Sequence, residues 1–96
     1  MPISHHAELP NTTIETYDKV NEKIDFDGNP PSGLVFHAAY PREDDGFRVF
    51  EVWDSREDFD RFEEERLMPA VREVFGEDPG EPPVREVTEI HHYLAP

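Results

Sequence analysis

The sequence has no cysteine and only two lysines, Lys19 and Lys23, among its 96 residues. The absence of cysteine excludes disulfides, thiolate nucleophiles and zinc sites built from cysteine. Nine basic residues stand against 23 acidic ones, and the resulting formal net charge of -14 repels phosphate backbones and anionic lipid surfaces. We therefore expect neither nucleic acid nor a membrane as a partner.

Targeting signals and the common catalytic motifs are lacking as well. Residues 1–6 contain neither a basic segment nor the start of a long apolar run, so no signal peptide is predicted and a cytoplasmic location is expected. No Ser/His/Asp motif, glycine-rich phosphate loop or HExxH pattern supports hydrolysis, nucleotide binding or zincin chemistry. Without a Pro/Gly/Ser linker in the middle, residues 1–96 predict one domain.

Two segments have the pattern of amphipathic helices. In the first, apolar residues recur at helical spacing up to residue 24: Ile14, Tyr17, Val20 and Ile24. Asn11 or Thr12 is the expected cap, with Glu15 completing a capping box on Thr12. The second helix is expected to start at Asp54 or Ser55, to kink at Pro69 and to end at Gly76.

Alternating and apolar stretches predict four strands, within residues 3–9, 33–40, 47–53 and 84–94. Residues 41–46, which end in Asp-Gly, predict a hairpin loop, and residues 77–83 form a Pro/Gly loop. The order strand-helix-strand-strand-helix-strand is typical of an α+β, ferredoxin-like fold. Such a fold has a four-stranded antiparallel sheet, both helices on one face, and the first and last strands side by side.

Both faces of the two strands joined by this hairpin loop are substantially apolar. Leu34, Phe36, Ala38 and Tyr40 alternate with Val35, His37 and Ala39, and the strand at 47–53 behaves in the same way. Two helices can cover only one face of a four-stranded sheet, and the same face of a second copy is the simplest cover for the other. The pattern therefore predicts a homodimer.

The run from Phe47 to Phe59, FRVFEVWDSREDF, resembles the strand-to-helix signature of dimeric α+β barrel proteins, especially the antibiotic-biosynthesis-type monooxygenases. The resemblance implies a dimeric α+β barrel, and it implies that Trp53 lines a pocket between sheet and helices. A histidine that many of these proteins carry on the second helix is replaced here, because Phe62, Glu63 and Glu64 occupy that stretch. We accordingly expect no haem and no other cofactor.

Two side chains in the strands are candidates for acid–base chemistry. His37 lies in the middle of an otherwise apolar strand, where an imidazole can take a proton from a phenolic substrate or simply form a structural hydrogen bond. Glu51 and Trp53 share a face, so a buried carboxylate can stand beside an aromatic wall. Glu51 can equally pair with Arg48 or Arg85 at a dimer interface.

The remaining histidines form two adjacent pairs near the chain ends. If the first and last strands are neighbours, His6 can lie opposite His91 and His5 opposite His92, with His37 or Glu89 as a third metal ligand. Adjacent histidines at strand ends are more often surface residues, so no metal site is assigned.

The leading hypothesis is a cofactor-independent monooxygenase for a small aromatic or polyketide-like substrate. His37 and Glu51 would be the catalytic residues, and Trp53, Tyr40 and Phe36 would wall the pocket and exclude water. The alternative is a non-catalytic dimer that binds a small molecule or another protein, with structural histidines.

Overall fold

A computed structural model describes residues 1–43, 46–76 and 84–96. Its strands are β1 (Ile3–Pro10), β2 (Leu34–Pro41), β3 (Gly46–Trp53) and β4 (Val84–Glu89). They form one antiparallel sheet in the order β2-β3-β1-β4. The helical segments are α1 (Ile14–Ile24), α2 (Arg56–Phe62), η1 (Glu63–Leu67) and α3 (Met68–Phe75). The predicted ferredoxin-like order is confirmed, and β1 and β4 are neighbours as expected.

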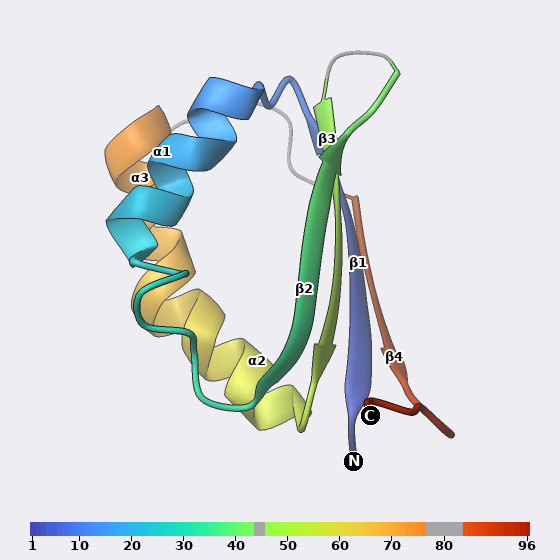
Figure 1. The fold of residues 1–96 in the computed structure, drawn as a ribbon. Helices are drawn as coiled ribbons and strands as arrows, with labels where there is room; N and C mark the ends of the chain where they lie inside the picture. The colour runs from blue at the N-terminus through green and yellow to red at the C-terminus, as the bar shows by residue number, and fades with distance from the viewer. Residues whose placement is uncertain (44–45, 77–83) are drawn as a thin grey trace.

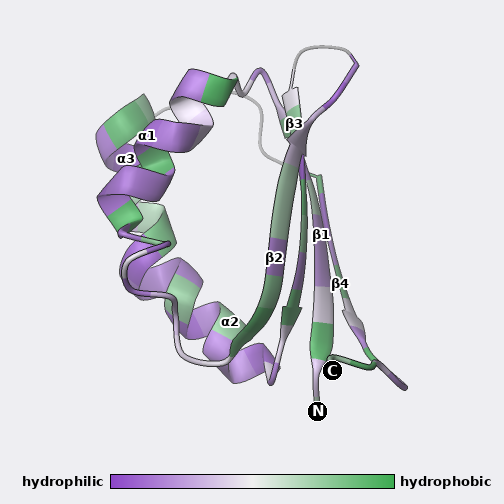
Figure 2. Ribbon diagram, viewed as in Figure 1, coloured by the Kyte–Doolittle hydropathy of each residue, from purple (hydrophilic) through white to green (hydrophobic). Residues whose placement is uncertain are grey.

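All the helices lie on one side of the sheet, and no described element covers the other side (Figure 1). Hydrophobic and hydrophilic residues alternate around the helices (Figure 2), which is the pattern of segments with one buried side. We call the sheet surface under the helices the inner face and the opposite surface the outer face. The buried cluster beneath the helices contains Ile3, Val20, Ile24, Phe26, Trp53, Phe59, Phe62 and Ala70.

The N-cap of helix α1 lies one residue after Thr12 and two residues after Asn11, the two predicted caps. Thr13 is the N-cap, and its hydroxyl accepts a hydrogen bond from the Thr16 N–H at 3.1 Å. Asn11 adopts a left-handed backbone conformation (φ 58°) that turns the chain out of β1, which leaves the capping position to Thr13. The predicted box on Thr12 is therefore wrong, whereas the predicted end at Ile24 is correct.

The second helix begins at the predicted Ser55 cap, whose hydroxyl accepts from the Asp58 N–H at 3.2 Å, and its last segment ends at Gly76. The kink expected at Pro69 takes the form of a π-helical stretch, η1, in which the Met68 N–H bonds to the Glu63 carbonyl five residues back. Proline lacks an N–H and clashes with the preceding turn, so the hydrogen-bond ladder changes just before it.

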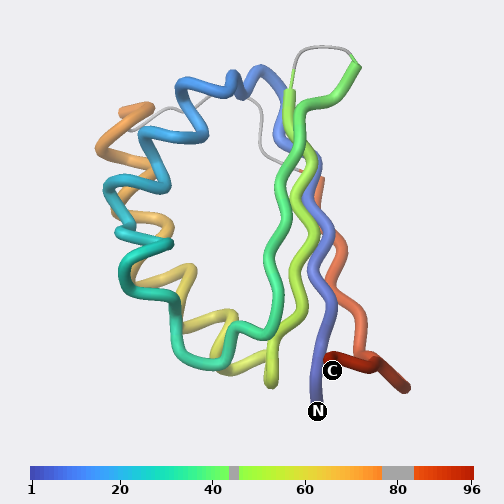
Figure 3. Tube along the Cα trace, in the orientation of Figure 1, coloured from blue at the N-terminus to red at the C-terminus, as the bar shows by residue number. Residues whose placement is uncertain are grey.

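The connection from α1 to β2 runs beside the second helical region (Figure 3). Arg66 of η1 holds it there, because its guanidinium donates to the carbonyls of Ile24 and Asn29, both at 2.7 Å. These bonds satisfy carbonyls that the end of a helix leaves unpaired. The predicted loop at 77–83 and residues 44–45 of the hairpin loop lie outside the described residues.

A bulge in β2 decides which side chains share a face. Leu34 pairs with Trp53, but Phe36 pairs with Val52, so the alternation changes by one residue between them. Leu34 thus packs against the inner cluster, while Phe36 and Tyr40 point to the outer face. The predicted face of Leu34, Phe36, Ala38 and Tyr40 is correct except for Leu34.

Phe59 is 1% exposed and packs against Trp53 with ring centroids 5.7 Å apart. We expect Phe59→Ala to lower the free energy of unfolding by about 3–5 kcal/mol, because the truncation leaves a cavity in the inner cluster. Urea denaturation measures the effect. The control Leu94→Ala, at a position 82% exposed, should change stability by less than about 0.5 kcal/mol. A Phe59→Ala variant as stable as this control would contradict the described core.

Candidate functional site

A buried carboxylate and two histidines meet on the inner face. Glu51 of β3 is paired across the sheet with His5 of β1 on one side and His37 of β2 on the other. Glu51 Oε1 lies 2.9 Å from His5 Nδ1, and Glu51 Oε2 lies 2.6 Å from His37 Nδ1. The Trp53 indole N–H donates to Oε1 at 3.1 Å. Glu51 is only 4% exposed, so the protein alone satisfies its oxygens.

The charge of Glu51 is stabilised by these donors. Burial raises the pKa of the carboxyl, but the hydrogen bonds from His37 and His5, the charge of His37 and the Trp53 N–H together outweigh it. They hold the pKa at about 2, below the ordinary value of 4.5. Glu51 is therefore ionised at neutral pH and can only accept hydrogen bonds.

Helix α1 adds a residue that the sequence did not single out. The Tyr17 hydroxyl lies 2.7 Å from His37 Nε2, so Tyr17, His37 and Glu51 form a continuous chain of hydrogen bonds. Burial raises the pKa of Tyr17, so its hydroxyl keeps its proton at neutral pH. Tyr17 appeared in the sequence only as one member of an apolar helix side, and no spacing rule links it to a strand twenty residues away.

Aromatic rings surround this chain of hydrogen bonds. Phe26 packs on His37 with ring centroids 4.6 Å apart, and Phe59 packs on His5 at 4.5 Å. Trp53 is fully buried beside Glu51. Within the described residues, His5 Nε2 has no hydrogen-bond partner although His5 is 6% exposed. The cluster is thus a polar group enclosed by apolar side chains.

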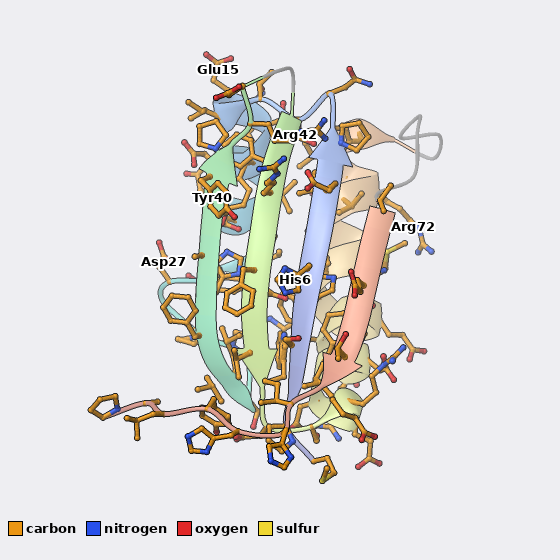
Figure 4. The ribbon with its side chains drawn as sticks, turned by 90° about the vertical axis from the view of Figure 1, so that its right-hand side faces the viewer. His6, Glu15, Asp27, Tyr40, Arg42 and Arg72 are labelled. Atoms are coloured by element: carbon orange, nitrogen blue, oxygen red, sulfur yellow. The ribbon has the colours of Figure 1, made fainter. Side chains whose placement is uncertain are left out.

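Phe36 and Tyr40 do not belong to this cluster. They are 53% and 47% exposed on the outer face, where Figure 4 shows Tyr40 and His6 on the side of the sheet away from the helices. They therefore cannot share a wall with Trp53, because successive residues of a strand point to opposite faces. The ligand contacts predicted for Phe36 and Tyr40 stay predictions that the arrangement of this cluster does not support.

The strand partners expected for His5 and His6 and the arginine partners expected for Glu51 are wrong. His5 and His6 lie opposite Val87 and Glu86, because β4 ends at Glu89, before His91 and His92. Across the described ranges, no group of three or more potential ligands is arranged to hold a metal ion. Glu51 bonds to neither of the expected arginines. Arg48 bonds to Glu8 at 2.9 Å, and Arg85 pairs with Glu63.

Two surface depressions lie away from the Glu51 cluster. One, of about 440 Å³, opens mainly on the outer face of β1 and β4, and the other, of about 480 Å³, lies between α1 and α3. Neither is lined by His37, Glu51 or Trp53. In the part of the chain that the structure describes, no helix combines the length and apolar character needed to cross a membrane.

The depressed pKa of Glu51 predicts a pH-dependent contribution to stability. A carboxyl whose pKa falls from 4.5 to about 2 on folding stabilises the fold by about 3 kcal/mol above pH 4.5, and this contribution is lost as the pH falls towards 2. We expect Glu51→Gln to cost about this much at neutral pH and progressively less in acid. Urea denaturation at a series of pH values measures both effects. The exposed control Glu64→Gln should have the free energy of unfolding of the wild type at every pH. A Glu51→Gln variant that also matches the wild type at every pH would contradict the buried ionised carboxylate.

Comparison with known proteins gives matches only at the level of structure. No family model matches the sequence, and no curated protein matches it. SnoaB from Streptomyces nogalater, described as a cofactor-independent oxygenase, is 12% identical, with a TM-score of 0.69 over 97% of this chain and 96% of that one. A Caulobacter crescentus protein proposed to be an antibiotic biosynthesis monooxygenase is 14% identical, with a TM-score of 0.73 over 95% and 91% of the two chains.

A dimeric ferredoxin-like protein of unknown function from Thermobifida fusca is 15% identical, with a TM-score of 0.65 over 94% and 92% of the two chains. At such low identities the likeness concerns the fold and not the reaction. The resemblance seen in the sequence is confirmed at this level: the chain has the fold of the dimeric α+β barrel proteins, which antibiotic-biosynthesis-type monooxygenases share.

Proposed function

We propose that this protein is a homodimeric, cofactor-independent monooxygenase that acts on a small phenolic or polyketide-like aromatic molecule. The observation that carries the proposal is the 2.6 Å contact between His37 Nδ1 and the buried, ionised Glu51. A carboxylate in this position fixes the ring orientation and stabilises the imidazolium that forms when His37 takes up a proton. His37 can therefore serve as the base that converts a phenol to its phenolate.

The proposed reaction needs only oxygen besides the substrate. An electron-rich phenolate reduces oxygen and forms a carbon–oxygen bond at a ring CH position, so that a phenol such as anthrol and one O₂ give the quinone and one water. The aromatic side chains around His37 and Glu51 would keep water from the reactive anion. SnoaB, which shares the fold, is described as a cofactor-independent oxygenase, and this likeness supports the class of reaction.

The homodimer is proposed from the uncovered outer face. Phe36 contacts Phe50 with ring centroids 6.1 Å apart, and Phe50 contacts His6 at 4.9 Å, so an aromatic row crosses three strands. Phe36 lies on the edge strand β2 and leaves 53% of its surface exposed. Exposed apolar patches of this kind mark interfaces, and a self-complementary sheet face fits a second copy. Proteins with this fold from Bacteroides fragilis and Thermobifida fusca are described as dimeric.

A non-catalytic role for the histidines is the second candidate, and one observation favours it. Both ring nitrogens of His37 are hydrogen-bonded within the protein, to Tyr17 and to Glu51, as in a structural network. In that case the protein would be a dimer that binds a small molecule or a protein partner. Measurements of turnover distinguish the two candidates.

Replacing His37 tests the catalytic role. With anthrol as the substrate, we expect His37→Gln to reduce kcat by about 100-fold or more, because general-base catalysis contributes at least that factor. Oxygen consumption by an electrode measures the rate, and equilibrium binding of anthrol shows whether the ligand is still held. His92→Gln, an exposed histidine outside the cluster, is the matched control. A His37→Gln variant with wild-type binding and turnover would show that His37 is not the base, whereas a wild type that binds anthrol without consuming oxygen would leave the non-catalytic candidate.

Charging the outer face tests the dimer. We expect the wild type to sediment as a dimer and Phe50→Glu to sediment as a monomer, because two carboxylates would have to be buried at one interface. Sedimentation velocity over a range of protein concentrations measures this. Met68→Glu, which charges a position 41% exposed on α3, should remain dimeric. If the wild type is a monomer at every concentration, the proposed self-association is wrong.

A further inference from the structure

Tyr17 occupies the position on His37 that a substrate would need. Its hydroxyl lies 2.7 Å from His37 Nε2, and its ring stacks on Phe47 with centroids 5.0 Å apart and planes 14° apart. The stacking fixes the direction of the phenol, so the contact with His37 is not that of a freely rotating surface side chain. Tyr17 comes from α1, which the fold holds against the sheet.

The hydrogen positions along this chain follow from Glu51. An ionised carboxylate has no hydrogen to give, so His37 must carry its hydrogen on Nδ1 to bond with Glu51. In the neutral imidazole the other nitrogen, Nε2, then holds only a lone pair, and Tyr17 must be the donor to it. The lone pair that the proposed base needs is therefore already engaged by the Tyr17 hydroxyl.

Exposure decreases in one direction along the chain of hydrogen bonds. Tyr17 is half-buried, the His37 side chain is 16% exposed, and Glu51 is 4% exposed. Strand β2, which carries His37, is an edge strand of the sheet, so Tyr17 stands where α1 meets that open edge. Tyr17 is the most exposed of the three residues, so we expect a ligand arriving at this edge to meet Tyr17 before His37.

We propose that Tyr17 is the catalytic residue that contacts the phenolic ligand and that His37 and Glu51 act through it. The inference rests on the proposed function and adds a residue to it. The ligand hydroxyl gives its proton to Tyr17 Oη while Tyr17 gives its own proton to His37 Nε2. The ligand becomes a phenolate, Tyr17 remains neutral, and the new imidazolium lies beside the Glu51 carboxylate. This is the arrangement of a hydroxyl, histidine and carboxylate that hydrolases use, with a phenol in place of serine.

We call this coupled transfer of two protons the relay; it also explains how a tyrosine with a raised pKa can take part in the removal of a proton from the ligand. Acidic neighbours, including Glu51 and Asp27, disfavour a free tyrosinate. In a coupled transfer Tyr17 receives one proton as it loses another, so no tyrosinate accumulates. The positive charge appears on His37 instead, where the same carboxylate stabilises it.

Kinetics of three variants test the relay with anthrol as the probe. We expect Tyr17→Phe to reduce kcat by about 100-fold with KM changed by less than about threefold, because the substitution removes one hydroxyl and keeps the ring stacked on Phe47. His37→Gln should lose a similar factor. The double variant should lose no more than either single one, since residues that act as a unit are not additive. Tyr93→Phe, at a position 40% exposed near the chain end, is the matched control, and thermal unfolding checks that each variant is folded.

The possible results separate this inference from the function on which it rests. If Tyr17→Phe keeps wild-type kcat while His37→Gln loses it, then His37 contacts the ligand directly and the inference is wrong, although the oxygenase proposal stands. Independent, multiplying losses in the double variant would overturn the relay as well. A wild-type protein that neither binds nor turns over anthrol and related polycyclic phenols would overturn the proposed function and the inference together.

Discussion

The buried carboxylate of Glu51 is the interaction on which the inner face depends. A charge that is 4% exposed is tolerated only when donors replace the water that it has lost, and three N–H groups do so here. Each donor comes from a residue whose place the sheet fixes: His5 and His37 lie directly across from Glu51 on the two neighbouring strands, and Trp53 follows two residues along the same strand. The register of three strands is thereby tied to one charged group, since a slip of one residue would turn these side chains to the outer face.

This constraint also gives the cluster its chemical character. Because Glu51 accepts from both imidazoles, it fixes the tautomer of His37 and directs its lone pair towards α1. A structural network and a proton relay have the same resting geometry, and they differ in whether a ligand reaches the most exposed residue in the chain of hydrogen bonds. Tyr17 is that residue, and it makes the cluster a candidate for chemistry at the open edge of the sheet.

The outer face of the sheet carries an aromatic row that the helices leave uncovered. The helices cover the face that holds the charge and the largest aromatic residues, while Phe36 and Phe50 remain on the other face with His6. Burying this row would add apolar contacts to a small domain, and the same face of a second copy of the chain is the simplest surface that could bury it. The polar site and the proposed dimer surface thus lie on opposite sides of the same three strands.

Local pattern in the sequence determined the elements, their order and the alternation of β3, because turn residues, caps and apolar spacing act over a few residues. It therefore placed Glu51 beside Trp53 and identified His37 as an isolated polar residue in an apolar strand. Three matters depended on contacts between distant segments and were decided only by the tertiary structure. The bulge in β2 moved Leu34 to the inner face, the end of β4 at Glu89 separated His91 and His92 from His5 and His6, and the packing of α1 on β2 brought Tyr17 to His37. Periodicity states which side of a strand or helix is apolar, but the partner across the gap is set by register and packing, which no single segment contains.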